Sequence, residues 1–150
     1  IADYIKKTFN LAIGDKTAEA IKMKIGAAVP LEEELTITIK GRDFIQGLPR
    51  TAQISTNEVV RAIDKELRTM IGAIKDVLSQ TPPELAADII DDGIIMTGGS
   101  SQLRNLSDLI YRRTGVKAYV ADEPLLCVAR GTGEALNHLD TYKKTILSKR

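Results

Sequence analysis

The sequence predicts an α/β fold that carries a small α+β insertion. Two changes in hydrophobic pattern support this: helical spacing gives way to a period of two in residues 34–54, and the last part of the chain alternates apolar strands with amphipathic helices. With 150 residues, 43% of them hydrophobic, the chain can bury a core as one domain or as two small lobes. We expect a larger α/β lobe from residues 1–15 and 56–150, and a smaller inserted lobe from residues 16–55.

Two helices are predicted near the start of the chain. Residues 2–11 have helical spacing, and Gly14 is the expected signal for the end of that helix. Its inward-facing residues would be Ile5, Phe9 and Leu11. Thr17 is the expected N-cap of the second helix, which Gly26 should end.

A small antiparallel sheet is expected in residues 34–54. Apolar and polar side chains alternate there on both sides of the turn residues Gly47 and Pro49. This change of period marks the sheet of the inserted lobe.

A long helix should follow the sheet. Residues 55–58, with the sequence STNE, form a capping box at its start. One apolar stripe then continues along the helix through Val59, Val60, Ile63, Leu67, Met70, Ile71, Ile74, Val77 and Leu78. Residues 81–84, with the sequence TPPE, break this helix and begin a short one that reaches Asp91.

The rest of the chain repeats an α/β pattern. The predicted elements are a strand at 93–97, a helix at 103–114, a strand at 116–120 and a helix at 125–139. Gly98 and Gly99 follow the first of these strands. A glycine pair lets backbone approach a bound group closely, and the helix behind it would offer free N–H donors and a positive dipole end.

That geometry suits a phosphate or a nucleoside. The same arrangement also serves as an ordinary tight turn in an αβ unit, so the residues alone leave both interpretations open.

Composition argues against several functional classes. Lys and Arg number 21 and Asp and Glu number 20, so the net charge of +1 supplies no basic field for nucleic acid. Cys127 lies in an apolar run and is expected to be a small buried hydrophobe. His138 has no second His or Cys at metal spacing, which argues against a zinc site or a catalytic triad.

Targeting signals are also not evident. No membrane-spanning run, signal peptide or lipidation motif is recognisable, so we expect a cytoplasmic protein. The chain opens at Ile1 within a helical pattern, and we expect it to be a piece of a longer polypeptide. The basic residues 143–150 are interpreted as a solvated terminus without a function.

Several segments, taken in order, resemble the MreB family of bacterial actin-like cytoskeletal proteins. They are TAEAIKMKIG, the strand pair ending in GLPR, the capped helix, TPPELAADI, IIMTGGSSQLRNL and ADEPLLCVARGTGEAL. The resemblance runs from end to end and covers the C-terminal half of that family's chain. It implies an actin-like, ribonuclease H-like ATPase fold, in which the two lobes correspond to subdomains IIA and IIB.

The resemblance also implies an ATP site. In MreB-like proteins the TGG loop and the TAExIK helix close around the adenosine of ATP. The matching cofactor-binding residues here are Glu19, Ala20, Ile21, Lys22, Gly98, Gly99, Ser100, Ser101 and Gln102. Without the resemblance, Glu19 and Lys22 would be an ordinary exposed ion pair on a helix. Ser100 stands where the family commonly has a third glycine.

Catalysis is not expected from this chain alone. The phosphate loops and the acidic residues that hold Mg²⁺ belong to the N-terminal half of the family, or to the junction before Ile1. Phosphoryl transfer needs the metal, the γ-phosphate clamp and a positioned water together. We therefore expect no ATP hydrolysis, no catalytic residue and no metal ligand in residues 1–150.

The resemblance implies a filament protein that controls rod shape and cell-wall synthesis. The implied partners are further copies of itself, a RodZ-like membrane-anchored protein on the larger lobe, and the cell-wall synthesis machinery. The implied location is the cytoplasm at the inner face of the cell membrane, with membrane contact only through the missing half.

Three alternatives stay open at the level of sequence. The first two, an ATP-binding lobe of a sugar or acetate kinase and that of an Hsp70-type chaperone, belong to the same superfamily. The third is a helical module that binds partners without nucleotide.

Overall fold

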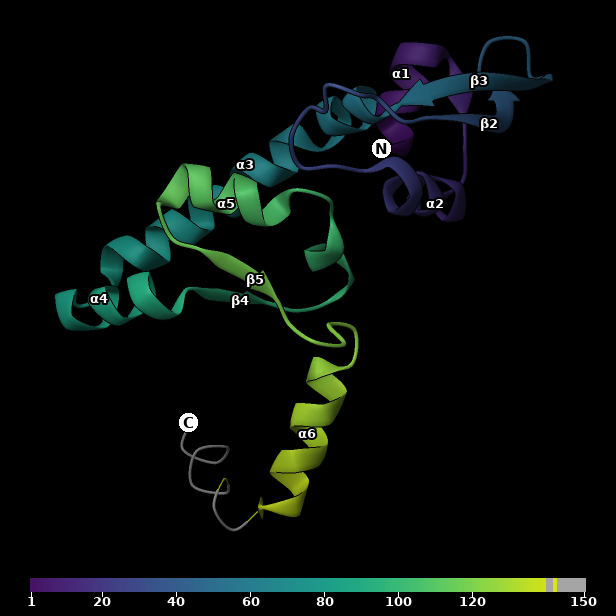
Figure 1. Ribbon diagram of the computed structural model, residues 1–150. Coiled ribbons are helices and arrows are strands. Elements are labelled where there is room, and N and C mark those ends of the chain that lie inside the picture. The colour runs from purple at the N-terminus through teal and green to yellow at the C-terminus, as the bar shows by residue number, and fades with distance from the viewer. Residues whose placement is uncertain (140–141, 143–150) are drawn as a thin grey trace.

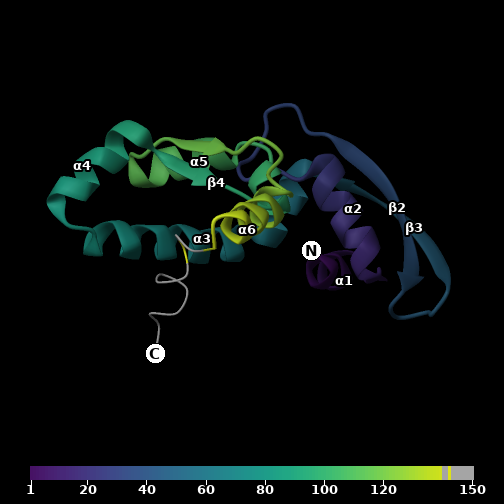
Figure 2. The same ribbon diagram turned by 90° about the horizontal axis from the view of Figure 1, so that it is seen from below.

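The computed structural model describes residues 1–139 and residue 142, so the basic segment 143–150 lies outside the described residues. Figure 1 shows two bodies joined by one long helix, α3 (Thr56–Gln80). The first body lies at the N-terminal end of α3, and the second lies along the rest of that helix. The same division is visible from below in Figure 2.

The first body combines two helices with a three-stranded antiparallel sheet. Its elements are α1 (Ala2–Phe9), β1 (Leu11–Ala12), α2 (Asp15–Ile25), β2 (Thr36–Asp43) and β3 (Pro49–Ser55). The strand order is β1-β2-β3, and the register places Thr36 opposite Ser55. The antiparallel pair expected in residues 34–54 is therefore confirmed.

The first two helices differ from the sequence prediction. Asn10 adopts a left-handed conformation, with φ 51°, and ends α1 at Phe9. The turn lets Leu11 pair with Asp43 as part of β1, so the prediction of a helix to Leu11 is wrong. The predicted N-cap at Thr17 is also wrong, because α2 begins at Asp15 and its N-cap is Gly14.

Residues 1–15 share a core with the inserted segment. Ile5 and Leu11 are almost fully buried, and they pack in one cluster with Ile21, Ile39 and Ile54. The sequence prediction places residues 1–15 in the larger lobe with residues 56–150, but this packing continues across the expected boundary at residues 15–16. We therefore propose that the smaller lobe extends back to residue 1.

Helix α3 begins with the predicted capping box. The Oγ of Ser55 accepts a hydrogen bond from the N–H of Glu58 at 3.4 Å, and the N–H of Ser55 donates to Oε2 of Glu58 at 2.8 Å. The apolar stripe of α3 serves two cores in succession, since Val59 packs in the first cluster and Ile71 in the second. Near the end of the stripe, Val77 is exposed.

The second body packs a two-stranded parallel sheet against α3 and α5. Its elements are α4 (Pro83–Asp92), β4 (Ile94–Met96), the 3₁₀ helix η1 (Gly99–Gln102), α5 (Leu106–Thr114) and β5 (Ala118–Val120). Ile110 and Ala118 are buried in its core with Ile71. Ile95 and Tyr119 are paired in the register and exposed. Only one face of this sheet is thus covered by the described helices.

Helix α6 (Cys127–Asn137) extends away from the sheet (Figure 1). Its apolar side chains stay exposed, with Val128 at 75% and Leu136 at 65%. Cys127 is half-buried, so the expectation of a fully buried cysteine is wrong in this structure. Among the described residues, no helix combines the length and apolar character that a membrane span requires.

Candidate functional site

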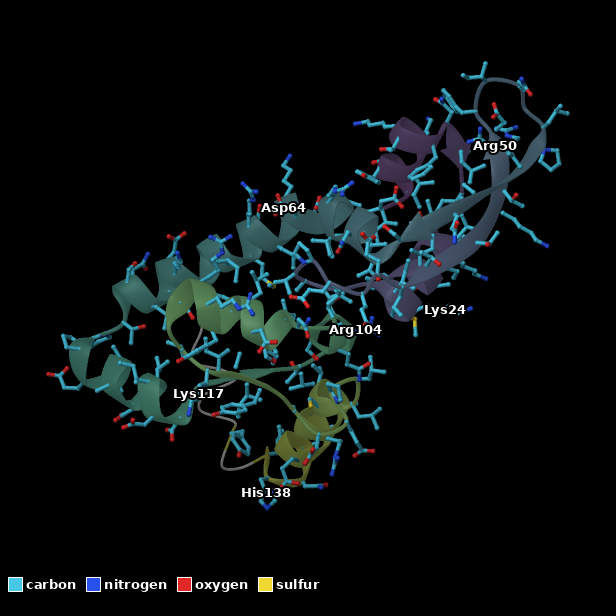
Figure 3. All side chains as sticks on the ribbon, turned by 45° about the horizontal axis from the view of Figure 1, so that its top comes forward. Lys24, Arg50, Asp64, Arg104, Lys117 and His138 are labelled. Atoms are coloured by element: carbon cyan, nitrogen blue, oxygen red, sulfur yellow. The ribbon has the colours of Figure 1, made fainter. Side chains whose placement is uncertain are left out.

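A cavity of about 400 Å³ lies where α2, α3 and η1 meet. Helix α2 contributes Lys22, and η1 contributes Gly99, Ser100 and Gln102. Figure 3 shows Arg104, another lining residue, in the region between α2 and α5. Segments almost eighty residues apart in sequence therefore form one site.

Backbone contacts hold the two sides of the cavity together. The N–H of Ala28 donates to the carbonyl of Arg104 at 2.8 Å, and Ala27 forms a parallel bridge with Arg104. Gly26 makes this approach possible, because a Cβ there would lie 2.2 Å from the carbonyl oxygen of Lys22 and 3.1 Å from Cδ1 of Leu103. The end of α2 is thus fixed against the segment that follows η1.

Four of the nine residues carried over from the family resemblance line this cavity: Lys22, Gly99, Ser100 and Gln102. Glu19 and Ala20 are exposed on the same helix and do not line it. Ile21 is 1% exposed and belongs to the first core, so its side chain is unavailable to a ligand. Within the described residues, no ion pair joins Glu19 to Lys22.

Gly98 and Ser101 shape the loop from within. Gly98 has φ 83°, a conformation that favours glycine, and its N–H donates to the carbonyl of Pro124 at 2.7 Å. Ser101 is buried and donates from Oγ to the carbonyl of Gly98 at 2.6 Å. Gly98 and Ser101 therefore stabilise the conformation of the loop itself.

A 3₁₀ turn begins at the second glycine of the pair, Gly99, and α5 begins only at Leu106. The helix predicted at 103–114 is therefore present and ends at Thr114, but its predicted start at Leu103 is wrong by three residues. The first N–H groups of a helical turn have no partner within that turn. The donors nearest the cavity come from η1, whose first residues, Gly99 and Ser100, line it.

Sequence reasoning missed much of the cavity wall. The additional lining residues are Met23, Gly26, Ile63, Glu66, Leu67, Met70, Leu103, Arg104 and Leu106. Those on α3 belong to the apolar stripe or lie next to it, so the stripe indicated burial but not which side of it faces a cavity.

The resulting site combines an apolar wall with two cations, Lys22 and Arg104, and one carboxylate, Glu66. Apolar side chains can hold a flat ring, while Lys22 and Arg104 can neutralise an anion. No cluster of three His, Cys, Asp or Glu side chains able to hold a metal occurs among the residues that the structure describes.

The fold matches solved structures of actin-like proteins. MreB 5 of Spiroplasma citri bound to AMPPNP aligns with a TM-score of 0.87 and 33% identity, over 98% of this chain and 44% of that one. A MamK double helical filament aligns over 82% of this chain and 38% of that one, with a TM-score of 0.65 and 22% identity, a level that shows the fold alone. The chain thus has an actin-like fold.

The chain belongs to the MreB/Mbl family, whose model matches residues 1–144. It is 43% identical to the cell shape-determining protein Mbl of Bacillus subtilis, over 99% of this chain and 44% of that protein. It is 40% identical to the cell shape-determining protein MreB of Escherichia coli K12, over 99% of this chain and 43% of that protein. The chain therefore spans less than half the length of these relatives.

Proposed function

We propose that this chain supplies one wall of an adenine-nucleotide site in a filament-forming protein that determines cell shape. The observation that carries the proposal is the cavity between α2, α3 and η1, which brings Lys22 together with Gly99, Ser100 and Gln102. Its family membership supports the proposal, since MreB5 of Spiroplasma citri has been solved bound to AMPPNP and to ADP.

The residues present fit the nucleotide. An adenine ring would lie against apolar side chains such as Met70 and Leu103, while Lys22 and Arg104 would face its anionic groups. Glu19, on the exposed part of α2, would reach the ribose from the rim. The Mg²⁺ ion would be held through the half of the protein that is absent from this chain.

For the whole protein, we propose ATP-dependent head-to-tail assembly that organises cell-wall synthesis and rod shape. Contacts of this kind do not close, so they generate open filaments. We further propose a cytoplasmic location at the inner face of the membrane and a RodZ-like anchored partner on the larger lobe. Membrane contact would come through the other half of the protein.

An NMR titration with ATP tests the nucleotide site. We expect the amides of Lys22, Gly99 and Ser100 to shift, with millimolar affinity because half a cleft buries only part of the ligand. Lys22→Glu should weaken binding about tenfold, which corresponds to about 1.4 kcal/mol. Gly99→Asp should abolish binding, because a carboxylate would face phosphate.

Lys24→Glu provides the matched control, because Lys24 lies on the same helix, is exposed and does not line the cavity. It should change ATP affinity less than twofold. Equal losses of ATP affinity in Lys22→Glu and Lys24→Glu would contradict the proposal. Amide shifts confined to residues outside the cavity would also contradict it. The same variants in the full-length protein would extend the test to filament assembly.

A further inference from the structure

A second groove lies on a different face of α3 from the nucleotide cavity. It has a volume of about 560 Å³ and is formed by α3, α5 and residues 28–30. We call it the α3–α5 groove. Its floor is apolar and includes Leu67, Ile71 and Leu109. Leu67 also lines the nucleotide cavity, and it is the residue that the two linings share.

Cations border the groove along α3. Arg61, Arg68 and Lys75 follow one another at intervals of seven residues, so they lie on one side of the helix. The distance from the first to the third is roughly 21 Å at the α-helical rise. From α5, Arg113 adds a fourth cation, one turn beyond Leu109.

These cations are only partly neutralised. Among the described residues that line the groove, the single carboxylate is Asp64, labelled in Figure 3, which pairs with Arg68 at 2.8 Å. Arg61 also lies near Glu34, whose pKa is lowered chiefly by a hydrogen bond with Ser55 and least by the charge of Arg61. Lys75 and Arg113 take part in none of the ion pairs found within residues 1–139 and 142.

We propose that the α3–α5 groove docks an acidic amphipathic segment of a partner protein. An amphipathic helix of about 15 residues would match the length of the cationic row on α3. Its apolar side chains would cover Leu67, Ile71 and Leu109, and its carboxylates would meet Lys75 and Arg113. This is the helix-in-groove mode of recognition, with charge setting the choice of partner.

The shape of the groove favours a protein partner over a lipid surface. Contact with a bilayer is made by apolar side chains that project outward, whereas the apolar residues here form the floor of a hollow. A helix can enter such a hollow and reach both the floor and the cations at its edges.

A designed probe tests this proposal with the 1–150 chain. The probe is a helical peptide of about 15 residues, with Leu at i, i+3, i+4 and i+7 and Glu elsewhere. The comparison peptide has Lys in place of each Glu. We expect the acidic peptide alone to bind, with NMR shifts at α3 and α5 and an affinity that falls with salt.

Two pairs of variants locate the contact. Arg113→Glu and Lys75→Glu should each weaken peptide binding about tenfold or more. The matched controls are Arg112→Glu and Lys65→Glu, because both residues are exposed on the same helices and neither lines the groove. These should change affinity less than twofold, and circular dichroism should show all four variants folded.

Several results would overturn the proposal. One is failure of the acidic peptide to bind at millimolar concentration. Another is an equal loss of peptide affinity in the groove variants and in their controls. If the peptide does not bind, the chain can be tested with vesicles of phosphatidylcholine and phosphatidylglycerol. Vesicle binding that depends on Lys75 and Arg113 would identify a membrane contact instead. Self-association that is lost in Arg113→Glu during sedimentation would identify an interface between copies.

Discussion

Asp43 organises the turn between β2 and β3 through its carboxylate. Its Oδ1 accepts hydrogen bonds from the N–H of Gln46 at 2.8 Å and of Ile45 at 2.9 Å, while Oδ2 lies 3.3 Å from Arg50. The hydrogen bond from Gln46, followed by that from Ile45 and the charge of Arg50, lowers the pKa of Asp43 from its ordinary value of 3.8.

This shift makes the stability of the chain depend on pH. Because the folded pKa is lowered, the contribution of Asp43 is fully present above pH 3.8 and is lost as pH falls through the folded pKa. Asp43→Asn keeps an acceptor oxygen but removes the charge, so the variant should be less stable than wild type at pH 7, by a difference that shrinks as pH falls through the folded pKa. Urea denaturation from pH 3 to pH 7 measures this, with the exposed Asp88→Asn as control. A difference that does not vary with pH would contradict the assignment.

Substitution by alanine should have opposite effects on stability at Gly26 and at Gly72. A Cβ at Gly26 would lie 2.2 Å from the carbonyl oxygen of Lys22, whereas nothing lies within 4 Å of a Cβ at Gly72 inside α3. Gly26→Ala should therefore destabilise the chain by about 2 kcal/mol through overpacking. Gly72→Ala should stabilise it by about 0.5–1 kcal/mol through helix propensity. Urea midpoints of the two variants that move in the same direction would refute the interpretation.

The start of α3 depends on the paired hydrogen bonds of Ser55 and Glu58. Ser55→Ala removes the acceptor for the N–H of Glu58 and should cost about 1 kcal/mol of unfolding free energy. Ser79→Ala is the matched control, because Ser79 lies near the other end of the same helix and its Oγ donates only to the carbonyl of Asp76. We expect that control to change the denaturation midpoint far less. Equal losses from the two variants would show that the capping box adds nothing to the stability of α3.

Elements specified by local sequence could be predicted, and those set by distant contacts could not. The capping box and the β2–β3 pair follow from residues close together in the chain, so their pattern was sufficient. Strand β1 escaped prediction because only its pairing with Arg42 and Asp43 makes Leu11 and Ala12 a strand. For the cavity, the glycine loop and Lys22 could be named from the family resemblance. Arg104 and Met70 could not, because they reach the site only through packing.

Several apolar side chains on the sheet and on α6 are exposed to solvent. Parallel sheets are normally covered on both faces, but Ile95 and Tyr119 are exposed on β4 and β5, and α6 exposes Val128. Sequence periodicity identified these residues as apolar and could not show which of them the chain itself would cover. Cys127 illustrates the point, since its apolar neighbours predicted burial and the position of α6 leaves it half-buried.

The two bodies have separate cores, which α3 joins. Ile54 and Ile110, each 1% exposed, belong to the first and the second cluster respectively. Truncation of either to Ala should cost about 2–5 kcal/mol. Because the clusters share no buried residue, we expect each substitution to destabilise only the body that contains it.

Native-state hydrogen exchange distinguishes a local loss of stability from a global one. Ile54→Ala should lower the protection of amides in β2 and β3 while that of α5 and β5 is kept, and Ile110→Ala should do the reverse. A uniform fall in protection across both bodies, in either variant, would show instead that α3 and the Ala28–Arg104 hydrogen bond couple the two cores into one cooperative unit. The cavity lined by α2, α3 and η1 lies between these bodies, so independent cores would let its two sides move apart without unfolding either body.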